Sequence, residues 1–114
     1  FGINKSQKEY LRNAVSYVCL DHYRGKVVNM FTDSTDHARQ KIIIENNHLK
    51  QKLIFYYEKN YLFDHINVGD SLVKEKGELF LKIYDSGSIS SHIWYFKFDR
   101  IKDFKKYPEI LSCK

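Results

Sequence analysis

The chain has 114 residues, of which 43% are apolar and 16% are aromatic. This length and composition predict one folded domain over residues 1–114 and exclude a disordered chain. The net charge is +5, from 19 Lys and Arg against 14 Asp and Glu. Most basic residues stand beside acidic or apolar ones, so we predict a mixed, solvated surface without a dedicated basic patch. The longest apolar runs, at 53–57 and 93–96, are far shorter than the ~20 residues of a membrane span.

The first 24 residues predict a helix. Ser6 and Glu9 have the spacing of a capping box, in which both side chains accept backbone N–H groups at a helix start. Apolar residues between positions 10 and 18 recur at helical spacing. We therefore expect an N-terminal helical segment over 1–24, with Gly25 ending either the helix or its connection.

Short β-rich runs fill residues 25–98, the predicted β-rich core of the domain. An antiparallel meander is expected from three of these runs, at 26–31, 41–45 and 51–57. Asn46-Asn47 fits the tight turn between the second and third runs, because Asn tolerates the left-handed conformation.

A single helical turn is expected at 61–66, and a second hairpin from 79–84 and 92–98. By strand alternation, one face of the last run should point to the core. That face consists of His92, Trp94, Phe96 and Phe98.

The C-terminal tail, 99–114, is expected to hold a short helix that Pro108 breaks, and then to end loosely. Together these elements predict a mainly β fold of the α+β class. In it the N-terminal helix packs on a strongly curved antiparallel β-sheet or small β-barrel.

The segment around Val68-Gly69-Asp70-Ser71 is a candidate working site or a structural turn. Gly69 can adopt a positive φ, while Asp70 and Ser71 can accept backbone N–H groups across a turn. We favour a structural corner. Residues 74–77 would then form an exposed polar excursion, and Gly77 would release the chain into the next strand.

Asp33, Asp36 and His37 are the nearest approach to a metal-ligand cluster, because two carboxylates and an imidazole lie within five residues. The same residues are ordinary turn chemistry, in which an Asp side chain bonds its own backbone. We favour the turn, and we expect no metal or other cofactor.

Cys19 and Cys113 lie near opposite ends of the chain and lack metal-ligand spacing. A disulfide between them would close a loop of ~95 residues and contribute about 4 to 5 kcal/mol in an oxidising compartment. The favoured alternative is a Cys19 that fills the core as a small apolar residue and a Cys113 with a free thiol near the terminus.

The aromatic residues have two interpretations. An exposed contact face could be formed by Tyr56, Tyr57, Tyr61, Tyr84, Trp94 and Tyr95, with Tyr56, Tyr61, Tyr84 and Tyr95 as its candidate contact residues, since Tyr and Trp offer apolar rings with a polar edge. The interpretation that we favour is that such rings fill the core of a small curled sheet. If the aromatic side chains are exposed, we expect them to contact a protein or small ligand rather than a glycan or nucleic acid.

The order of several motifs resembles a group of small uncharacterised proteins of Bacteroidetes, many of them exported or lipid-anchored. That group has a Gly-x-Val strand, an Asp-x-x-(Asn)-His loop and an Ile/Val-Gly-Asp-Ser-Ile/Leu-x-Lys segment before a Gly-containing turn. The matching positions here are Gly25, Val27, Asp33, His37, Val68, Gly69, Asp70, Ser71, Leu72, Lys74 and Gly77, with Asp36 where Asn is more usual. The resemblance covers roughly residues 25–98 and implies a small β-rich fold in the envelope or outside the cell, without an activity.

No catalytic signature surrounds any Ser, Cys or His of the sequence. The leading hypothesis is therefore a non-enzymatic binding or structural module that is periplasmic, at the cell surface or secreted, and contacts a protein or small ligand. Because the sequence starts at Phe1 without Met, we expect a mature or trimmed form whose signal peptide has been left off. The resemblance implies a lipid anchor on that preceding segment. An oligonucleotide-binding β-barrel is the alternative, although nucleic acid is a less favoured partner, and a small hydrolase ranks below it.

Overall fold

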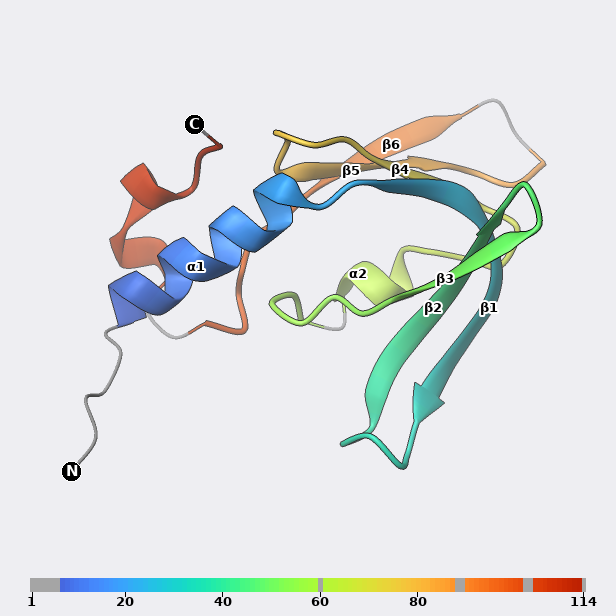
Figure 1. The fold of residues 1–114 in the computed structure, drawn as a ribbon, viewed down its shortest axis with the longest axis horizontal. Coiled ribbons are helices and arrows are strands. Elements are labelled where there is room, and N and C mark those ends of the chain that lie inside the picture. The colour runs from blue at the N-terminus through green and yellow to red at the C-terminus, as the bar shows by residue number, and fades with distance from the viewer. Residues whose placement is uncertain (1–6, 60, 88–89, 102–103, 114) are drawn as a thin grey trace.

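The computed structural model describes residues 7–59, 61–87, 90–101 and 104–113. One long helix, α1 (Gln7–Leu20), precedes a six-stranded antiparallel sheet of order β3-β2-β1-β4-β5-β6 (Figure 1). The strands are β1 (Tyr23–Asp33), β2 (Arg39–Asn46), β3 (Leu49–Leu53), β4 (Ser71–Lys74), β5 (Phe80–Tyr84) and β6 (Ser91–Tyr95). A short helix α2 (Tyr61–Asp64) follows β3, and two 3-10 turns, η1 (Phe104–Lys106) and η2 (Pro108–Ile110), lie near the C-terminus.

The predicted α+β class is confirmed. The sheet does not close into a barrel, because β3 and β6 form its two edges. Within the described part of the chain, no helix has the length and apolar character of a bilayer span.

Strand β1 joins the two halves of the sheet. Its first residues, from Tyr23 to Lys26, pair with β4, whereas the part from Lys26 to Asp33 pairs with β2 across a β-bulge near Val28. Figure 1 shows that β1 bends along its length. Gly25 was predicted to end the helical segment or its connection, but it lies inside this strand. A Cβ at Gly25 would lie 3.0 Å from the Glu45 carbonyl oxygen, so a larger residue would require the β2 backbone to move away by a few tenths of an ångström.

The β2–β3 hairpin has the predicted type of turn, shifted by one residue. Asn46 pairs with Leu49, so the two turn residues are Asn47 and His48, with φ of 52° and 67°. Both values fit the left-handed turn that follows the twist of a hairpin. The third predicted strand is too long, because β3 ends at Leu53 and residues 54–57 leave the sheet.

The bend at Gly69 and Asp70 connects α2 to β4. Gly69 has a φ of 101°, and its N–H donates to the Val27 carbonyl at 2.8 Å. The buried Asp70 carboxylate accepts the N–H groups of Asn67 and Ser86, each at 2.9 Å. The segment 67–70 is therefore fastened to both β1 and the loop after β5.

Residues after this bend differ from the prediction of a polar excursion. Ser71 begins β4, a strand between β1 and β5, and Lys74 is only 2% exposed. The Lys74 ammonium donates to the carbonyls of Asp21 and Glu75 at 3.0 and 2.7 Å, and burial lowers its pKa. The excursion is limited to 75–77, where Gly77 has a φ of 88° and donates its N–H to the Cys19 carbonyl.

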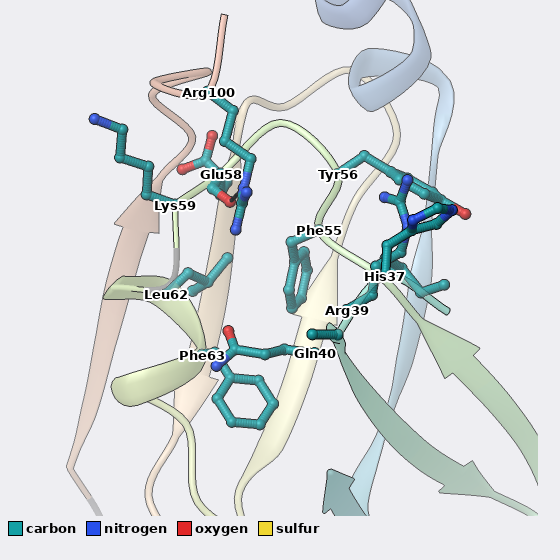
Figure 2. Close-up of a pocket in the computed structure, with 12 residues that line it drawn as sticks. His37, Arg39, Gln40, Phe55, Tyr56, Glu58, Lys59, Leu62, Phe63 and Arg100 are labelled. Atoms are coloured by element: carbon teal, nitrogen blue, oxygen red, sulfur yellow. Dashed lines mark hydrogen bonds between the residues drawn. The ribbon is translucent and has the colours of Figure 1, made fainter. Parts of the chain in front are cut away.

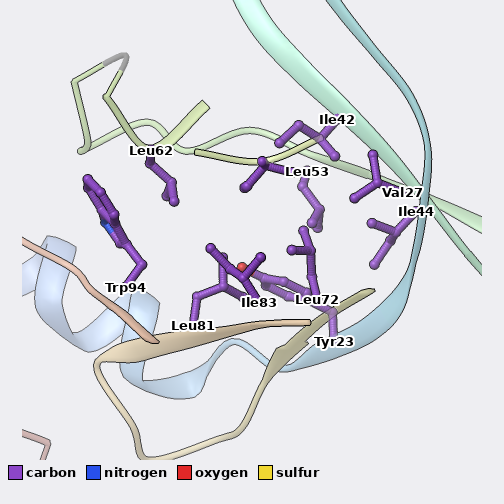
Figure 3. Close-up of a cluster of buried hydrophobic side chains, with 11 residues drawn as sticks. Tyr23, Val27, Ile42, Ile44, Leu53, Leu62, Leu72, Leu81, Ile83 and Trp94 are labelled. Atoms are coloured by element: carbon purple, nitrogen blue, oxygen red, sulfur yellow. The ribbon is translucent and has the colours of Figure 1, made fainter. Parts of the chain in front are cut away.

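The main core lies on one face of the sheet, where α2 and the segment after it cover it (Figure 3). Its buried members are Tyr23, Val27, Ile42, Ile44, Leu53, Leu62, Ile66, Leu72, Leu81, Ile83 and Trp94. Of the predicted core face of the last strand, Trp94 and Phe98 are buried and Phe96 is half-buried. His92 is exposed at the strand end, 3.6 Å from an Asp85 oxygen.

A second apolar cluster joins α1 to the C-terminal segment. The prediction that the helix packs on the core of the sheet is therefore wrong for the main core. Leu11, Ala14 and Val15 face Phe98, Ile101 and Ile110, and Figure 1 shows α1 beside the last part of the chain. The helix follows the predicted periodicity and begins at the first described residue. Ser6 of the predicted capping box lies outside the described residues.

A disulfide between Cys19 and Cys113 ties α1 to the C-terminus, with Cα atoms 5.7 Å apart. The favoured prediction of a core Cys19 and a free Cys113 is therefore wrong, as is that of a loose end. The short helix expected before Pro108 is the 3-10 turn η1, which ends at Lys106. Pro108 itself begins η2, since proline suits a first helical position. The ends meet because Ile110 packs against α1, which a linear sequence does not reveal.

Candidate functional site

A cleft of about 260 Å³ opens at one end of the sheet (Figure 2). Three segments form it: residues 37–40 at the start of β2, residues 54–59 after β3, and the first turn of α2. Arg100, beyond β6, completes the rim. Its lining residues are His37, Ala38, Arg39, Gln40, Ile54, Phe55, Tyr56, Glu58, Lys59, Leu62, Phe63 and Arg100.

Glu58 positions one wall of the cleft. Its side chain is almost completely buried, at 4% exposed, and accepts hydrogen bonds from the Trp94 indole at 3.1 Å, the Lys97 N–H at 2.9 Å and the Phe98 N–H at 2.6 Å. Burial raises the pKa of Glu58, and the backbone and indole donors oppose that rise. The carboxylate thus fixes the segment 54–59 to the end of β6.

Two guanidinium groups lie on opposite sides of the cleft (Figure 2). The Arg39 guanidinium is 4.9 Å from the centre of the Tyr56 ring, and its Nε is 3.6 Å from an Asp36 oxygen. Arg100 donates through Nε to the Glu58 carbonyl. In Figure 2 the Lys59 ammonium points away from the cleft, so the arginines supply the positive charge inside it.

Apolar side chains separate these arginines. Figure 2 shows the Phe55 ring between the two sides of the cleft, with Leu62 to its left and Phe63 below it. The cleft therefore combines an apolar floor with guanidinium groups, which bind carboxylates and phosphates through paired N–H donors.

The predicted loop site divides into two parts. Asp33 and Asp36 both contact the buried Lys41 ammonium, at 2.7 and 2.9 Å, while His37 lines the cleft with a φ of 53°. A lysine ammonium thus takes the position between the carboxylates that a cation would need. Among residues 7–59, 61–87, 90–101 and 104–113, no three His, Cys, Asp or Glu side chains could together hold a metal ion.

Replacing Asp33 with Asn is expected to destabilise the fold at neutral pH but not near pH 2. Hydrogen bonds from Lys41 and Thr35 lower the pKa of Asp33 from 3.8 to about 2. A carboxyl whose pKa falls on folding stabilises the folded state above its unfolded value, and that contribution is lost as pH falls through about 2. Urea unfolding of both proteins across this range measures the difference. Lys41→Met should remove most of the same pH dependence, and an Asp33→Asn effect that persisted unchanged in acid would contradict this assignment.

The four tyrosines of the predicted contact surface do not form one surface. Tyr56 lines the cleft and Tyr61 is exposed on α2. Tyr84 and Tyr95 are exposed on β5 and β6. The favoured prediction that the rings fill the core is wrong for these four, whereas Trp94 is buried in the main core and Tyr57 packs half-buried against the second cluster.

Sequence reasoning missed Arg39, Glu58 and Arg100. Glu58 stands between Tyr57 and Lys59 in a turn-rich stretch, which is typical of a solvated charge. Its burial depends on donors 36 to 40 residues away, and no local pattern contains them. No family model, curated protein or solved structure matches this chain.

Proposed function

We propose that this protein is a non-enzymatic binding module that holds a small anionic ligand with a flat apolar part in the cleft. The observation that carries this proposal is the pair of guanidinium groups, Arg39 and Arg100, on opposite sides of the Phe55 ring (Figure 2). An aromatic carboxylate is the simplest ligand of this kind, because its ring suits the floor and its oxygens suit the arginines.

The electrostatics of the cleft support an anion. Of the acidic residues that the structure describes, only Glu58 lines it, and both oxygens of that carboxylate accept hydrogen bonds from the protein. Arg39 is held flat by stacking on Tyr56, so little conformational entropy is lost when it binds a planar anion.

The lining supports binding rather than nucleophilic catalysis. Among the described residues of the cleft wall none is Ser, Thr or Cys, and both cysteines of the chain are joined in the disulfide. On the described wall of the cleft, His37 and Glu58 therefore have no Ser, Thr or Cys beside them to act as a nucleophile and form a covalent intermediate.

The disulfide supports an oxidising location, and we place the protein in the bacterial envelope or outside the cell. A lipid anchor on a segment before Phe1 belongs to the same proposal and rests on the motif resemblance alone. The finer fold proposal is a strongly curved sheet, in which the bend of β1 brings residues 37–40 towards 54–59 to shape the cleft (Figure 1).

Titration calorimetry with benzoate and with benzamide, its neutral analogue of similar shape, tests the proposal. Benzoate is expected to bind about ten-fold tighter at low salt, because charge-assisted hydrogen bonds contribute roughly 1.5–3 kcal/mol. Arg39→Lys should remove most of this preference and leave benzamide binding unchanged, since lysine keeps the charge but not the planar fork.

Arg12→Lys is the matched control, because Arg12 is an exposed arginine of α1 that does not line the cleft. This variant should bind benzoate as the unchanged protein does. Equal affinity for benzoate and benzamide, or absence of heat with either at millimolar concentration, would reject the anion-binding cleft.

A further inference from the structure

The outward face of β4, β5 and β6 carries rings and cations in register. On β5 the core side holds Leu81 and Ile83, so Phe80, Lys82 and Tyr84 point to the other side. Strand β6 pairs Tyr95 with Phe80, Ile93 with Lys82 and Ser91 with Tyr84. These pairs form three cross-strand rows on one face.

The rings on this face are accessible. Tyr95 is 63% exposed and Tyr84 is 43% exposed. The Phe80 and Tyr95 rings lie 5.7 Å apart and form one aromatic pair. Tyr84 is four residues from Phe80 on the same strand, about 13 Å away, so the face offers two separate stacking positions.

Cations extend the same rows across the sheet. Arg24 of β1 pairs with Val73 of β4, which pairs with Lys82. Lys26 is likewise in line with Tyr84, through Ser71. Arg24 also lies 3.7 Å from Glu75, at the end of β4, in an exposed ion pair, which leaves its charge only partly compensated.

On β4, β5, β6 and the part of β1 that pairs with β4, no outward position in these rows holds an acidic side chain, and Glu45 of β2 lies opposite Lys26 at the border of this face. The outward positions are Arg24, Lys26, Ser71, Val73, Phe80, Lys82, Tyr84, Ser91, Ile93 and Tyr95. The surface is thus basic and aromatic at once. The sequence did not predict such a patch, because the three cations come from β1 and β5, more than fifty residues apart.

We propose that this face, independently of the cleft, binds single-stranded nucleic acid. One base stacks on the Phe80–Tyr95 pair and another on Tyr84, while Lys82 between them contacts phosphate. Arg24 and Lys26 continue the phosphate path across β1. Sequence-tolerant stacking on aromatic side chains beside a basic track is the general chemistry of single-strand binding.

The central position of Lys82 favours a nucleic acid over a protein partner. Protein interfaces concentrate apolar residues at the centre and are depleted there in lysine, whereas here the lysine stands between the rings. A polymer that alternates flat bases with phosphates matches this order of ring, cation and ring in both shape and charge.

Fluorescence anisotropy with a labelled oligothymidylate of about twelve nucleotides tests the proposal. Binding is expected at about 20 mM salt and should weaken steeply towards about 150 mM. Tyr84→Ala and Tyr95→Ala should each weaken binding about five-fold or more, as expected for a lost base stack. Lys82→Ala should reduce the slope of log affinity against log salt by about 0.7, the value for one phosphate contact of a single strand.

Two controls are matched to these variants. Tyr61→Ala removes an equally exposed tyrosine from α2, and Lys8→Ala removes an exposed lysine from α1. Both should leave the affinity unchanged. Circular dichroism of every variant shows that the sheet is intact.

Three results would overturn the proposal. The first is absence of binding at low salt. The second is equal weakening by Tyr61→Ala and Tyr84→Ala. The third is competition by dextran sulfate, an anionic glycan, together with a loss of dextran sulfate affinity in Tyr84→Ala as large as the loss of oligonucleotide affinity. That result would assign the face to acidic polysaccharide instead.

Discussion

Replacing Cys19 and Cys113 together with alanine is expected to lower the free energy of unfolding by about 4 to 5 kcal/mol. The disulfide spans 94 residues, so its removal releases nearly the whole unfolded chain from one closed loop. The second apolar cluster, with Leu11 and Ile110, remains in the variant and should keep the chain folded. Urea unfolding followed by circular dichroism measures the change.

The matched comparison is the unchanged protein with and without a reducing agent. Reduction should reproduce the loss seen in the double variant, while the double variant should not respond to reductant. Ser112→Ala, next to Cys113 and exposed, should have little effect. A change below about 1 kcal/mol in the double variant would show that the loop closure contributes little.

Reduction also has a local consequence that follows from the fold. The C-terminal segment contacts α1 through η1 and η2, and the disulfide is its only covalent tie to that helix among the described residues. Hydrogen exchange should therefore increase first at residues 104–113, ahead of the sheet. Exchange at this segment before the sheet is expected because parts of a protein can open cooperatively at a free energy below that of global unfolding.

Local sequence patterns predicted the elements whose contacts are local. The α1 helix follows from apolar residues one turn apart, and the β2–β3 hairpin follows from a left-handed turn at Asn47. Both structures form between near neighbours, so the information lies within a few residues.

Elements that depend on distant partners could not be predicted in this way. Strand β4 has only four residues and ends in a lysine, which is typical of an exposed segment. It becomes a strand because β1, about fifty residues earlier, and β5 pair with it. Lys74 is then buried where its ammonium donates hydrogen bonds to the carbonyls of Asp21 and Glu75.

The candidate sites have the same origin. The cleft combines residues from segments around 37–40, 54–63 and 100, and the outward face combines β1 with β5 and β6. His37 and Tyr56 belong to different predicted sites, and the fold brings them to one cleft. Pairing between strands that are distant in the sequence creates such sites. The local hydrophobic periodicity of a single sequence does not reveal which strands pair.

Replacing Glu58 with alanine is expected to lower the free energy of unfolding by about 3 kcal/mol. The change leaves three donors without their acceptor, namely the Trp94 indole and the N–H groups of Lys97 and Phe98. An unsatisfied buried donor costs about 1–3 kcal/mol, and relief from burying a carboxylate offsets part of the sum. Urea unfolding by circular dichroism gives the free energy. Fluorescence of Trp94, the one tryptophan of the sequence, reports the local loss of the hydrogen bond.

The pH dependence distinguishes a buried carboxylate from a merely polar contact. Burial raises the pKa of Glu58 above 4.5, so the folded state binds this proton more tightly than the unfolded state does. The resulting stabilisation is complete below pH 4.5 and is lost as the pH rises through the folded-state pKa. The difference in stability between the unchanged protein and Glu58→Ala should therefore shrink from acid to neutral pH.

Glu58→Gln supplies the control for charge, because it keeps the size and one acceptor oxygen. We expect an intermediate loss of stability, because the new amide nitrogen faces a donor. The free energy of unfolding of this variant should also lack the pH dependence that comes from Glu58. If Glu58→Ala instead unfolded within about 0.5 kcal/mol of the unchanged protein, the segment 54–59 would have to be held by its apolar contacts alone. The wall of the cleft would then owe its position to Phe55 and Tyr57, which pack near Phe96 and Phe98.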